Sequence, residues 1–586
     1  MLEILESRIA PAAVFYYTDV DGDHVKISVT GTKTAAATLQ TDLNTAVEAG
    51  LTNYPANALV GKPHQLQTLV LGPAFAGASV SITATPSTDL DAAGVTTKLG
   101  DGFVNVGEII AGTVSGGNIV STISLTSVTV HGDLGQIVVG SGTATKGPGL
   151  VSLNVQSMGE FGTSTGANAT TSRFINGVDS IYVAHDVNGV ELRADLSTAA
   201  TVPDATIGSI FIGGSLIGGT TADTGEIAAA NGIGSVKIMG SVIGNSANDT
   251  GRIATSSNTI TNTSGTKTYT GNLGSVIIGG DLIGGAGTNS GVVYSSGTVT
   301  SVAIKGSVQG GSADISGGIN ANSIGAVLIG GDLQGTVFSG TAAVAQTANI
   351  RAQLNIKSVT IGGSVISGAN TGTGGLSYSG AIQAGQTLGL VKVTGSIVGN
   401  AATPVTISGT GLSGVGLNKV TLRSQDPAIA GVTVAGSSTY AIIEAGYGVN
   451  GATISGDAQI GPVTVGGDFI ASDIIAGVKV QTAGTDFGTS TDSLIATPII
   501  TPSVATDGIF SKIASITIGG QIEGTVATGD SFGIEAQKIG PITVGGLPLE
   551  LKTTVVITNG LSQVLDDEYI SQSTGHDVHI REFPGT

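Results

Sequence analysis

Short segments of alternating apolar and polar residues recur along most of this chain, and each is followed by a glycine corner. Residues 207–219 have the sequence IGSIFIGGSLIGG, and the same pattern returns from residues 233, 273, 299, 324, 356, 388, 460, 513 and 539. Alternation of this kind is typical of a β-strand with one buried face. A pattern that returns at a nearly fixed spacing indicates a repeat protein, in which each unit buries its apolar side chains against its neighbours.

Residues 233–257 show what one repeat contains. Residues 235–238 alternate polar and apolar side chains, residues 241–243 give a second apolar stretch and residues 252–255 a third, with Gly, Asn and Asp residues between them. Three short strands separated by turn residues correspond to one coil of a parallel β-solenoid. Stacking of such coils would place Val236 between Ile210 and Val276.

The spacing of the repeats supports this fold. The motifs at 207 and 233, at 273 and 299, and at 513 and 539 start 26 residues apart, and those at 299 and 324 start 25 residues apart. Longer intervals hold polar insertions, of which 258–271 and 481–511 are predicted to be loops or small projections. The predicted fold is all-β: a right-handed parallel β-helix of roughly 25-residue coils, with the handedness taken from the fold class.

The first residues break the repeat and predict a cap over the first coil. Residues 15–31 alternate on both sides of Asp19-Val20-Asp21-Gly22-Asp23, which predicts a β-hairpin with an Asp-Gly turn. Asp19, Asp21 and Asp23 also form the front half of a calcium-loop pattern, although no bidentate Glu follows at the expected distance. A plain turn is the simpler interpretation, and a calcium site is the alternative; no other cofactor is predicted.

A helix is expected to complete the N-terminal cap. Residues 33–49 place Leu39, Leu43, Ala46 and Val47 on one helical face, and Gly50 follows as a candidate C-cap. The predicted domains are therefore 1–64 (N-terminal motif, hairpin and helix), 65–546 (parallel β-helix with insertions) and 547–586 (C-terminal cap or subunit-contact tail).

The C-terminal segment departs from the repeat and concentrates charge. Stretches within 551–560 and 568–573 predict strands, and His576, Asp577 and His579 offer a weak metal-binding pattern. A solvated cap is the simpler interpretation. The tail could also add a strand to the exposed end of a second subunit.

Composition narrows the classes of function. The chain has 94 Gly, no Trp and only 4% aromatic residues, which fits thin stacked strands better than a globular enzyme. Its net charge of −19 argues against nucleic acid or an anionic membrane as a partner. The absence of Cys excludes disulfides and thiolate sites, and no apolar run is long enough to predict membrane insertion.

The sequence predicts no catalytic activity. It lacks the nucleophile-elbow, zinc-protease and phosphate-loop motifs. Asp281, Asp332 and Asp468 occupy one corner position, but a coil with Ser307 separates the first two. His131 and His185 lie at equivalent corners, where a structural or exposed role is expected.

The N-terminal sequence resembles that of a known group of surface proteins. Residues 5–12, LESRIAPA, are similar to the Leu-Glu-Pro-Arg type motif that heads large, repeat-rich, predicted surface proteins of planctomycetes and verrucomicrobia. Ser7 stands where that motif has proline, and the usual upstream basic stretch is missing. The hairpin and the Gly-Gly-Ser repeats extend the resemblance over most of the chain. It implies a surface location and says nothing of activity.

Together these features predict a structural bacterial protein, extracellular or at the cell surface, whose copies self-assemble into a filament, sheath or lattice. Exposed β-edges and repetitive flanks suit repeated contact with other copies, so the expected partner is the chain itself. The alternative is an adhesin-like stalk whose insertions bind glycans or a host surface. A polysaccharide-degrading β-helix enzyme is a further alternative.

Overall fold

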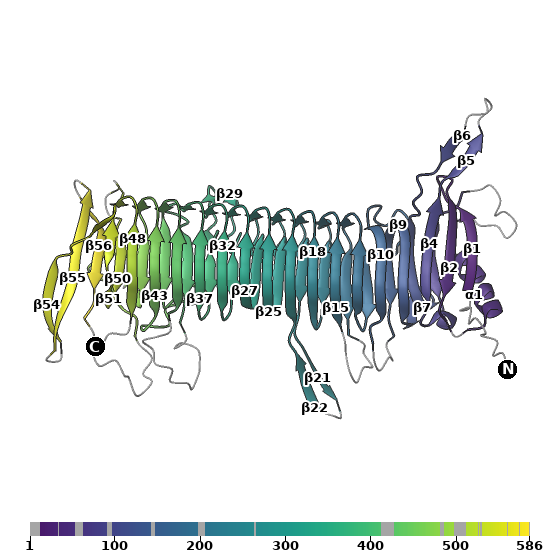
Figure 1. The fold of residues 1–586 in the computed structure, drawn as a ribbon, viewed down its shortest axis with the longest axis horizontal. Helices are drawn as coiled ribbons and strands as arrows, with labels where there is room; N and C mark the ends of the chain where they lie inside the picture. Colours follow the sequence, from purple (N-terminus) through teal and green to yellow (C-terminus); the bar gives the residue numbers. More distant parts are fainter. Residues whose placement is uncertain are drawn as a thin grey trace, which may run out of the picture. The chain divides into compact units, whose positions relative to one another are not determined.

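The structure is a computed structural model, and it describes residues 12–32, 34–52, 63–90, 96–141, 147–196, 205–262, 265–411, 427–480, 486–496, 511–525, 527, 530–558, 561–572 and 575–584. The chain divides into two compact units, Met1–Gly279 and Gly280–Thr586, which we describe separately. As predicted, the regular secondary structure of the described residues is almost entirely β-strand, with α1 as the one α-helix (Figure 1). The motif at residues 5–11 and most of the 481–511 insertion lie outside the described residues.

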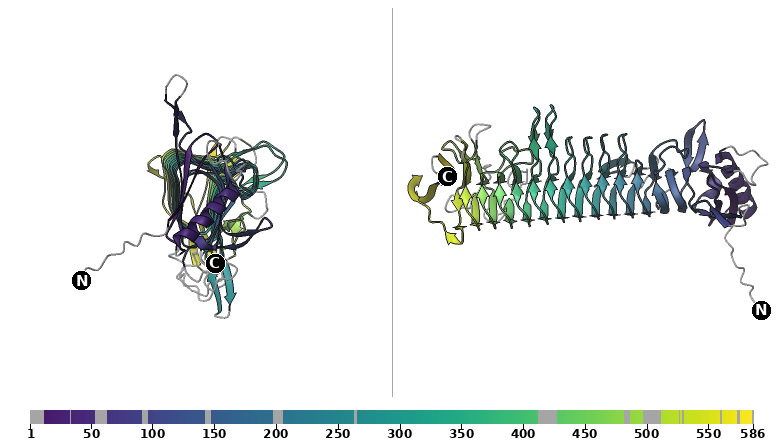
Figure 2. Two further views of the ribbon diagram at one scale, coloured as in Figure 1. Left: turned by 90° about the vertical axis from the view of Figure 1, so that its right-hand side faces the viewer. Right: turned by 90° about the horizontal axis from the view of Figure 1, so that it is seen from above.

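The first unit begins with the predicted cap. Strands β1 (Ala12–Thr18), β2 (His24–Thr30) and β4 (Ser79–Thr85) form an antiparallel sheet, and β4 continues in parallel with β9 (Leu125–Val139). Helix α1 (Ala36–Gly50) packs across β1 and β3 (Leu66–Leu71) (Figure 2). The hairpin and the helix are therefore confirmed.

The packing of α1 corrects one detail of the prediction. Leu39, Leu43 and Val47 are buried as expected, but Gly50 is the last helical residue and Leu51 follows in extended conformation. A Cβ atom on Gly50 would lie 1.6 Å from the carbonyl oxygen of Thr68 on β3. Glycine is needed here because the helix end contacts a strand, rather than because the helix stops.

The coils of the first unit stack in register. Ile210, Val236 and Val276 are neighbours on three successive parallel strands, as predicted. Coil strands of this unit are β7 (Val106–Ser115), β10 (Leu150–Met158), β11 (Thr171–Ile175), β12 (Val178–Val183), β13 (Val187–Asn188), β14 (Glu191–Asp195), β15 (Thr206–Ile212), β16 (Leu216–Ile217), β17 (Glu226–Ala229), β18 (Gly232–Ile238), β19 (Val242–Ile243), β20 (Arg252–Thr255) and β23 (Asn272–Ile278). Each coil thus contributes three short strands, and their inward Val, Ile and Leu side chains form the core.

Several hairpins project from this unit. The predicted loop at 258–271 is instead an antiparallel hairpin of β21 (Asn258–Asn262) and β22 (Gly265–Tyr269) (Figure 1). Its Thr-rich alternation favours pairing between its two halves. The others are β5 (Ser87–Leu90) with β6 (Thr96–Leu99), and β8 (Asn118–Thr122) with the end of β7; the 3₁₀ helix η1 (Pro73–Phe75) lies between β3 and β4.

The second unit has the same three-strand coil. Its coil strands are β24 (Leu282–Ile283), β25 (Val292–Ile304), β26 (Val308–Gln309), β27 (Gly318–Ile329), β28 (Leu333–Gln334), β31 (Ile350–Ala352), β32 (Ile356–Ile361), β33 (Val365–Ile366), β36 (Ile382–Ala384), β37 (Leu388–Val393), β38 (Ile397–Val398), β39 (Val405–Gly409), β40 (Ile429–Val434), β41 (Ser438–Thr439), β42 (Ala441–Ala445), β43 (Gln459–Val465), β44 (Phe469–Ile470), β45 (Asp473–Ala476), β48 (Lys512–Ile518), β49 (Ile522–Glu523), β50 (Phe532–Ala536), β51 (Lys538–Ile539) and β52 (Ile542–Val544). Insertions add short pairs: β29 (Val337–Phe338) with β34 (Ala369–Asn370), β30 (Val344–Ala345) with β35 (Leu376–Ser377), and β46 (Val478–Lys479) with β47 (Ser493–Leu494).

A line of side chains at the glycine corner, here called the corner ladder, explains the Gly-Gly-Ser/Asp consensus. Asp332 Oδ1 accepts the backbone N–H of Ser364 at 2.6 Å, and Ser307 Oγ accepts that of Asp332 at 3.1 Å. In the second unit the ladder runs through Asp281, Ser307, Asp332, Ser364, Ser396, Ser437, Asp468 and Gln521. Each Asp or Ser side chain of the ladder thus satisfies a backbone donor of the next coil, and the Gln521 N–H is the last of these donors.

The glycine pair makes room for this ladder. A Cβ atom on Gly362 would lie 2.2 Å from the carbonyl oxygen of Gly330, and one on Gly363 would lie 2.1 Å from Asp332 Oδ1. The first glycine therefore permits close stacking of the backbones. The second leaves space for the side chain of the preceding coil.

The C-terminal segment forms a three-stranded antiparallel sheet at the end of the second unit. Strand β56 (Gly575–Glu582) pairs in parallel with β50, and β55 (Leu561–Gln572) and β54 (Thr553–Thr558) follow in antiparallel order. The short strand β53 (Leu547–Pro548) pairs with β52. The predicted divergent cap is thus a sheet extension that ends in β54 (Figure 1).

No helix among the described residues has both the length and the hydrophobicity that a bilayer-spanning helix needs.

Candidate metal centre

The turn between β1 and β2 brings the three predicted aspartates together. One carboxylate oxygen from each of Asp19, Asp21 and Asp23 lies within 4.8 Å of the others. The turn is closed by a hydrogen bond from the Asp23 N–H to Asp19 Oδ1, at 2.8 Å, and Gly22 has a φ of +104°. The Asp-Gly turn therefore aims three carboxylates at one point, as the alternation of the sequence predicts.

Two buried oxygen atoms at this turn lack partners. Asp23 is fully buried and Asp19 is 5% exposed, whereas Asp21 is exposed. Within the described residues, neither Asp23 Oδ1 nor the buried Tyr17 hydroxyl has a hydrogen-bond partner. A buried carboxylate oxygen without a partner is costly, and a cation is the group that would satisfy it most directly.

The electrostatics of the turn favour the same conclusion. Burial, followed by a hydrogen bond to Asp21 and the nearby carboxylates, raises the pKa of Asp19 to about 8. The same hydrogen bond lowers the pKa of Asp21, while burial raises that of Asp23. Because like charges in close contact cannot all ionise without compensation, the turn holds either a proton or a cation.

A second loop closes over the carboxylates, and sequence reasoning missed it. The N–H of Gly102 donates to Asp23 Oδ2 at 2.6 Å, and the N–H of Asp101 donates to Asp21 Oδ2 at 3.2 Å. A Cβ atom on Gly100 would lie 1.8 Å from Asp23 Oδ1, so only glycine fits there. The sequence feature that could have indicated this loop is the Gly-Asp-Gly string at 100–102, which is a second acidic turn.

These residues fit a hard cation of the calcium type. Calcium takes six to eight oxygen ligands and accepts irregular geometry, with water completing the set. Asp19, Asp21 and Asp23 would supply the protein ligands, and Asp101 adds a nearby negative charge that contributes to the raised pKa of Asp23. No other group of three close ligand residues occurs within the described parts of the chain.

The remaining sequence candidates have structural roles. His131 and His185 are exposed at coil corners, as predicted. His131 Nδ1 contacts the Gly102 carbonyl at 2.9 Å. The corner carboxylates of Asp281, Asp332 and Asp468 belong to the corner ladder, so each already accepts a backbone hydrogen bond.

His579 differs from the expectation of a solvated cap, and the side chains of His576 and Asp577 lie outside the described residues. His579 is 3% exposed, and its Nε2 lies 2.6 Å from Asp567 Oδ1 on β55, because β56 enters the coil sheet instead of remaining at the surface. Its partner is thus an acid on the neighbouring strand.

A cluster of buried acids in the second unit was not predicted. Glu444, Asp473 and Glu535 are at most 7% exposed and lie on β42, β45 and β50. Burial raises the pKa of Glu444 and of Asp473 to about 8 and that of Glu535 to about 9. The signal was a single acid in each of the otherwise apolar strand sequences AIIEA, DIIA and FGIEA.

A buried apolar cluster lies close to these acids, whose charges contribute, after burial, to the raised pKa of its member Tyr447. Tyr447, Phe487 and Ile495 form part of a buried cluster with residues from β45, β46 and the C-terminal end. The raised pKa values of these acids favour their protonated forms at neutral pH.

Comparison with known proteins gives no family assignment, since no protein-family model, no curated protein and no solved structure matches this chain.

Proposed function

We propose that the chain is a structural, non-enzymatic repeat protein of the bacterial cell exterior, whose copies assemble into a filament, sheath or lattice. The observation that carries this proposal is the outer edge of β54. Within the described residues β54 pairs only with β55, so its other edge faces no strand. Unpaired strand edges are templates for pairing with a second chain.

The composition of β54 favours such pairing. Its sequence, TTVVIT, contains no charged residue, no glycine and no proline, and Val555 is 64% exposed. These are the features of segments that add strands to one another. Among the described residues, other hairpin strands that pair on one edge only have the sequences NIVST, NTITN and STDL, and they are shorter and less apolar than β54.

In the N-terminal cap, the edge of β1 that does not pair with β2 is covered. Gln40 of α1 accepts a hydrogen bond from the Val14 N–H at 2.9 Å and donates one to the Val14 carbonyl at 2.7 Å. The His64 N–H likewise donates to the Thr18 carbonyl. Side chain and loop thus replace a neighbouring strand on β1, which leaves β54 as the better edge for self-association.

Pairing of two β54 edges would be isologous and would by itself give a dimer. An extended assembly needs a second contact. The β7–β8 hairpin is a candidate because Ile119 and Val120 are 41% and 67% exposed there. The surface location rests on the resemblance at residues 5–12 and remains part of the proposal.

Light scattering and electron microscopy of the full chain test this function. We expect concentration-dependent association of the native chain and its loss in Val555→Lys, which places a charge on the β54 edge. Val398→Lys is the matched control, because Val398 is 43% exposed on a coil strand with neighbours on both sides.

A native chain that stays monomeric at every concentration would contradict self-assembly. Association that is unchanged in Val555→Lys would show that β54 is not the contact. Comparing samples in calcium and in chelator shows whether the N-terminal carboxylates contribute to assembly.

A further inference from the structure

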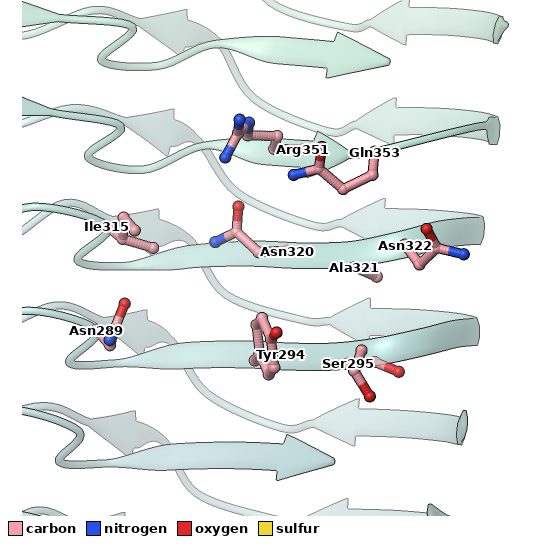
Figure 3. Close-up of a pocket in the computed structure, with 10 residues that line it drawn as sticks. Asn289, Tyr294, Ser295, Ile315, Asn320, Ala321, Asn322, Arg351 and Gln353 are labelled. Atoms are coloured by element: carbon pink, nitrogen blue, oxygen red, sulfur yellow. The ribbon is translucent and has the colours of Figure 1, made fainter. Parts of the chain in front are cut away.

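A hollow of about 230 Å³ with a mixed polar and apolar lining lies on the face formed by β25, β27 and β31 of the second unit. Tyr294, Asn320 and Arg351 are register neighbours on three successive strands and lie one beyond another in the hollow (Figure 3). Asn322 and Gln353 line it farther along β27 and just after β31. With Asn289, which also lines it, the hollow combines one aromatic ring, four amides and one cation.

Arg351 differs from three of the four other arginines that the structure describes; the fourth, Arg581, lies over the Phe583 ring, 4.4 Å from its centroid. Arg173, Arg193 and Arg252 each form ion pairs with carboxylates, for example Arg173 Nε with Asp195 Oδ2 at 2.6 Å. No described carboxylate forms an ion pair with Arg351. Its strand neighbours are the neutral side chains of Asn320 and Gln383.

The guanidinium of Arg351 is partly withdrawn from water. Its Nη1 donates to Gln346 Oε1 at 3.3 Å, while its buried Nε has no hydrogen-bond partner within the described residues. Burial lowers the pKa of Arg351, and the opposing influence comes from the Tyr378 side chain rather than from a carboxylate. A desolvated cation without a counter-ion gains most from a planar anion that pairs with it in bidentate geometry.

The rest of the hollow matches a sugar ring. Tyr294 is 36% exposed and offers an aromatic ring beside the cation. The amides of Asn322 and Gln353 can both donate to and accept from hydroxyl groups. Asn320 is held in place by Asn349, whose Nδ2 donates to it at 3.2 Å. Drug-sized ligands occupy pockets of about 300–1,000 Å³, so the hollow suits a single ring.

We propose that this hollow binds a carboxylated sugar ring, a uronate unit of an acidic polysaccharide, with its carboxylate on Arg351 and its ring against Tyr294. The chain carries a net charge of −19, so a polyanion has no general attraction for it. Binding therefore depends on this one cation. The site does not require assembly through β54.

Titration calorimetry of the full chain with galacturonate and glucuronate oligosaccharides tests the proposal. A neutral galactose oligosaccharide of the same length, acetate and inorganic phosphate serve as comparison ligands. We expect binding of a uronate oligosaccharide and none of the neutral one. Arg351→Gln should weaken binding about tenfold or more, and Arg351→Lys should weaken it less.

Two further variants distinguish loss of the binding site from loss of the fold. Tyr294→Ala should weaken binding of the uronate without changing the circular dichroism spectrum. Lys357→Gln, which removes an exposed cation from the next strand of the same unit, should leave affinity unchanged.

Three results would overturn the proposal: no binding of either uronate, equal binding of the neutral oligosaccharide, or native affinity in Arg351→Gln. Acetate or phosphate that binds as tightly as the uronate would identify a general anion site instead. Val555→Lys should retain uronate binding, which separates this site from self-assembly.

Discussion

Two sets of acidic residues in the second unit differ in chemistry because they differ in their relation to the repeat. The aspartates of the corner ladder, such as Asp332, are partly exposed, and serine fills the same position in neighbouring coils. Glu444, Asp473 and Glu535 lie on strands whose equivalent positions are usually neutral, and all three are buried. An acid at a position where other coils have serine accepts a backbone hydrogen bond and supports the coil. An acid at a position where other coils have neutral residues marks a candidate functional site.

Alkaline pH should affect the two sets very differently, and this is the largest effect that we expect. The pKa values of Glu444, Asp473 and Glu535 are raised by burial to about 8, 8 and 9. Folding therefore favours their protonated forms, so their contribution to stability is complete below about pH 4 and is lost as the pH rises through 8 and 9. One pKa unit corresponds to about 1.4 kcal/mol, so several kcal/mol should be lost between pH 5 and pH 9.

Chemical denaturation of native chain and Glu535→Gln across this pH range measures the effect. Gln has nearly the same shape and cannot ionise, so the variant should have a flatter dependence of the free energy of unfolding on pH. Glu523→Gln, at a partly exposed coil position, is the control and should follow the native curve. Parallel curves for native chain and Glu535→Gln would show that this acid does not set the pH dependence.

The same distinction explains how far the sequence predicts the structure. Coils such as 233–257 could be predicted because each alternating strand is supported by its neighbours above and below, and the register of Ile210, Val236 and Val276 follows directly. The hairpin and α1 were also predictable, since their signals are local. The position of Gly50 was not, because its constraint comes from a contact with Thr68 on another strand.

The candidate sites show the limit of local reasoning more clearly. Asp19, Asp21 and Asp23 are adjacent in sequence, so their convergence was predictable. The closing loop at 100–102 comes from about eighty residues later, and no local pattern links it to the turn. The isolation of Arg351 depends on the absence of a carboxylate on neighbouring coils, which requires the register of insertions of different lengths.

The comparison extends to the N-terminal cap, where we expect calcium to have an effect of intermediate size on the free energy of unfolding. Asp19, Asp21 and Asp23 also lie off the repeat, so we expect calcium to stabilise the first unit. A ligand present at a hundred times its dissociation constant contributes about 2.7 kcal/mol. Thermal unfolding in calcium and in chelator measures this shift.

Variants at the turn make the calcium test specific. Asp23→Asn should abolish the calcium-dependent shift, because it neutralises the most buried ligand. Glu48→Gln, an exposed acid on α1, should retain it. An unfolding temperature that is the same in calcium and in chelator would contradict a calcium site. It would indicate that the three carboxylates bind a proton instead.

Substitution within the corner ladder should have the smallest effect and tests the other half of the comparison. Asp332→Ser places at this corner the residue that Ser307 and Ser364 already supply in adjacent coils, so the Ser364 N–H keeps an acceptor and stability should change little. Asp332→Ala removes that acceptor and should cost about 1–2 kcal/mol, measured as the free energy of unfolding in denaturant. If Asp332→Ser were as destabilising as Asp332→Ala, the carboxylate charge itself would matter at the corner, and position within the repeat would no longer separate supporting acids from functional ones.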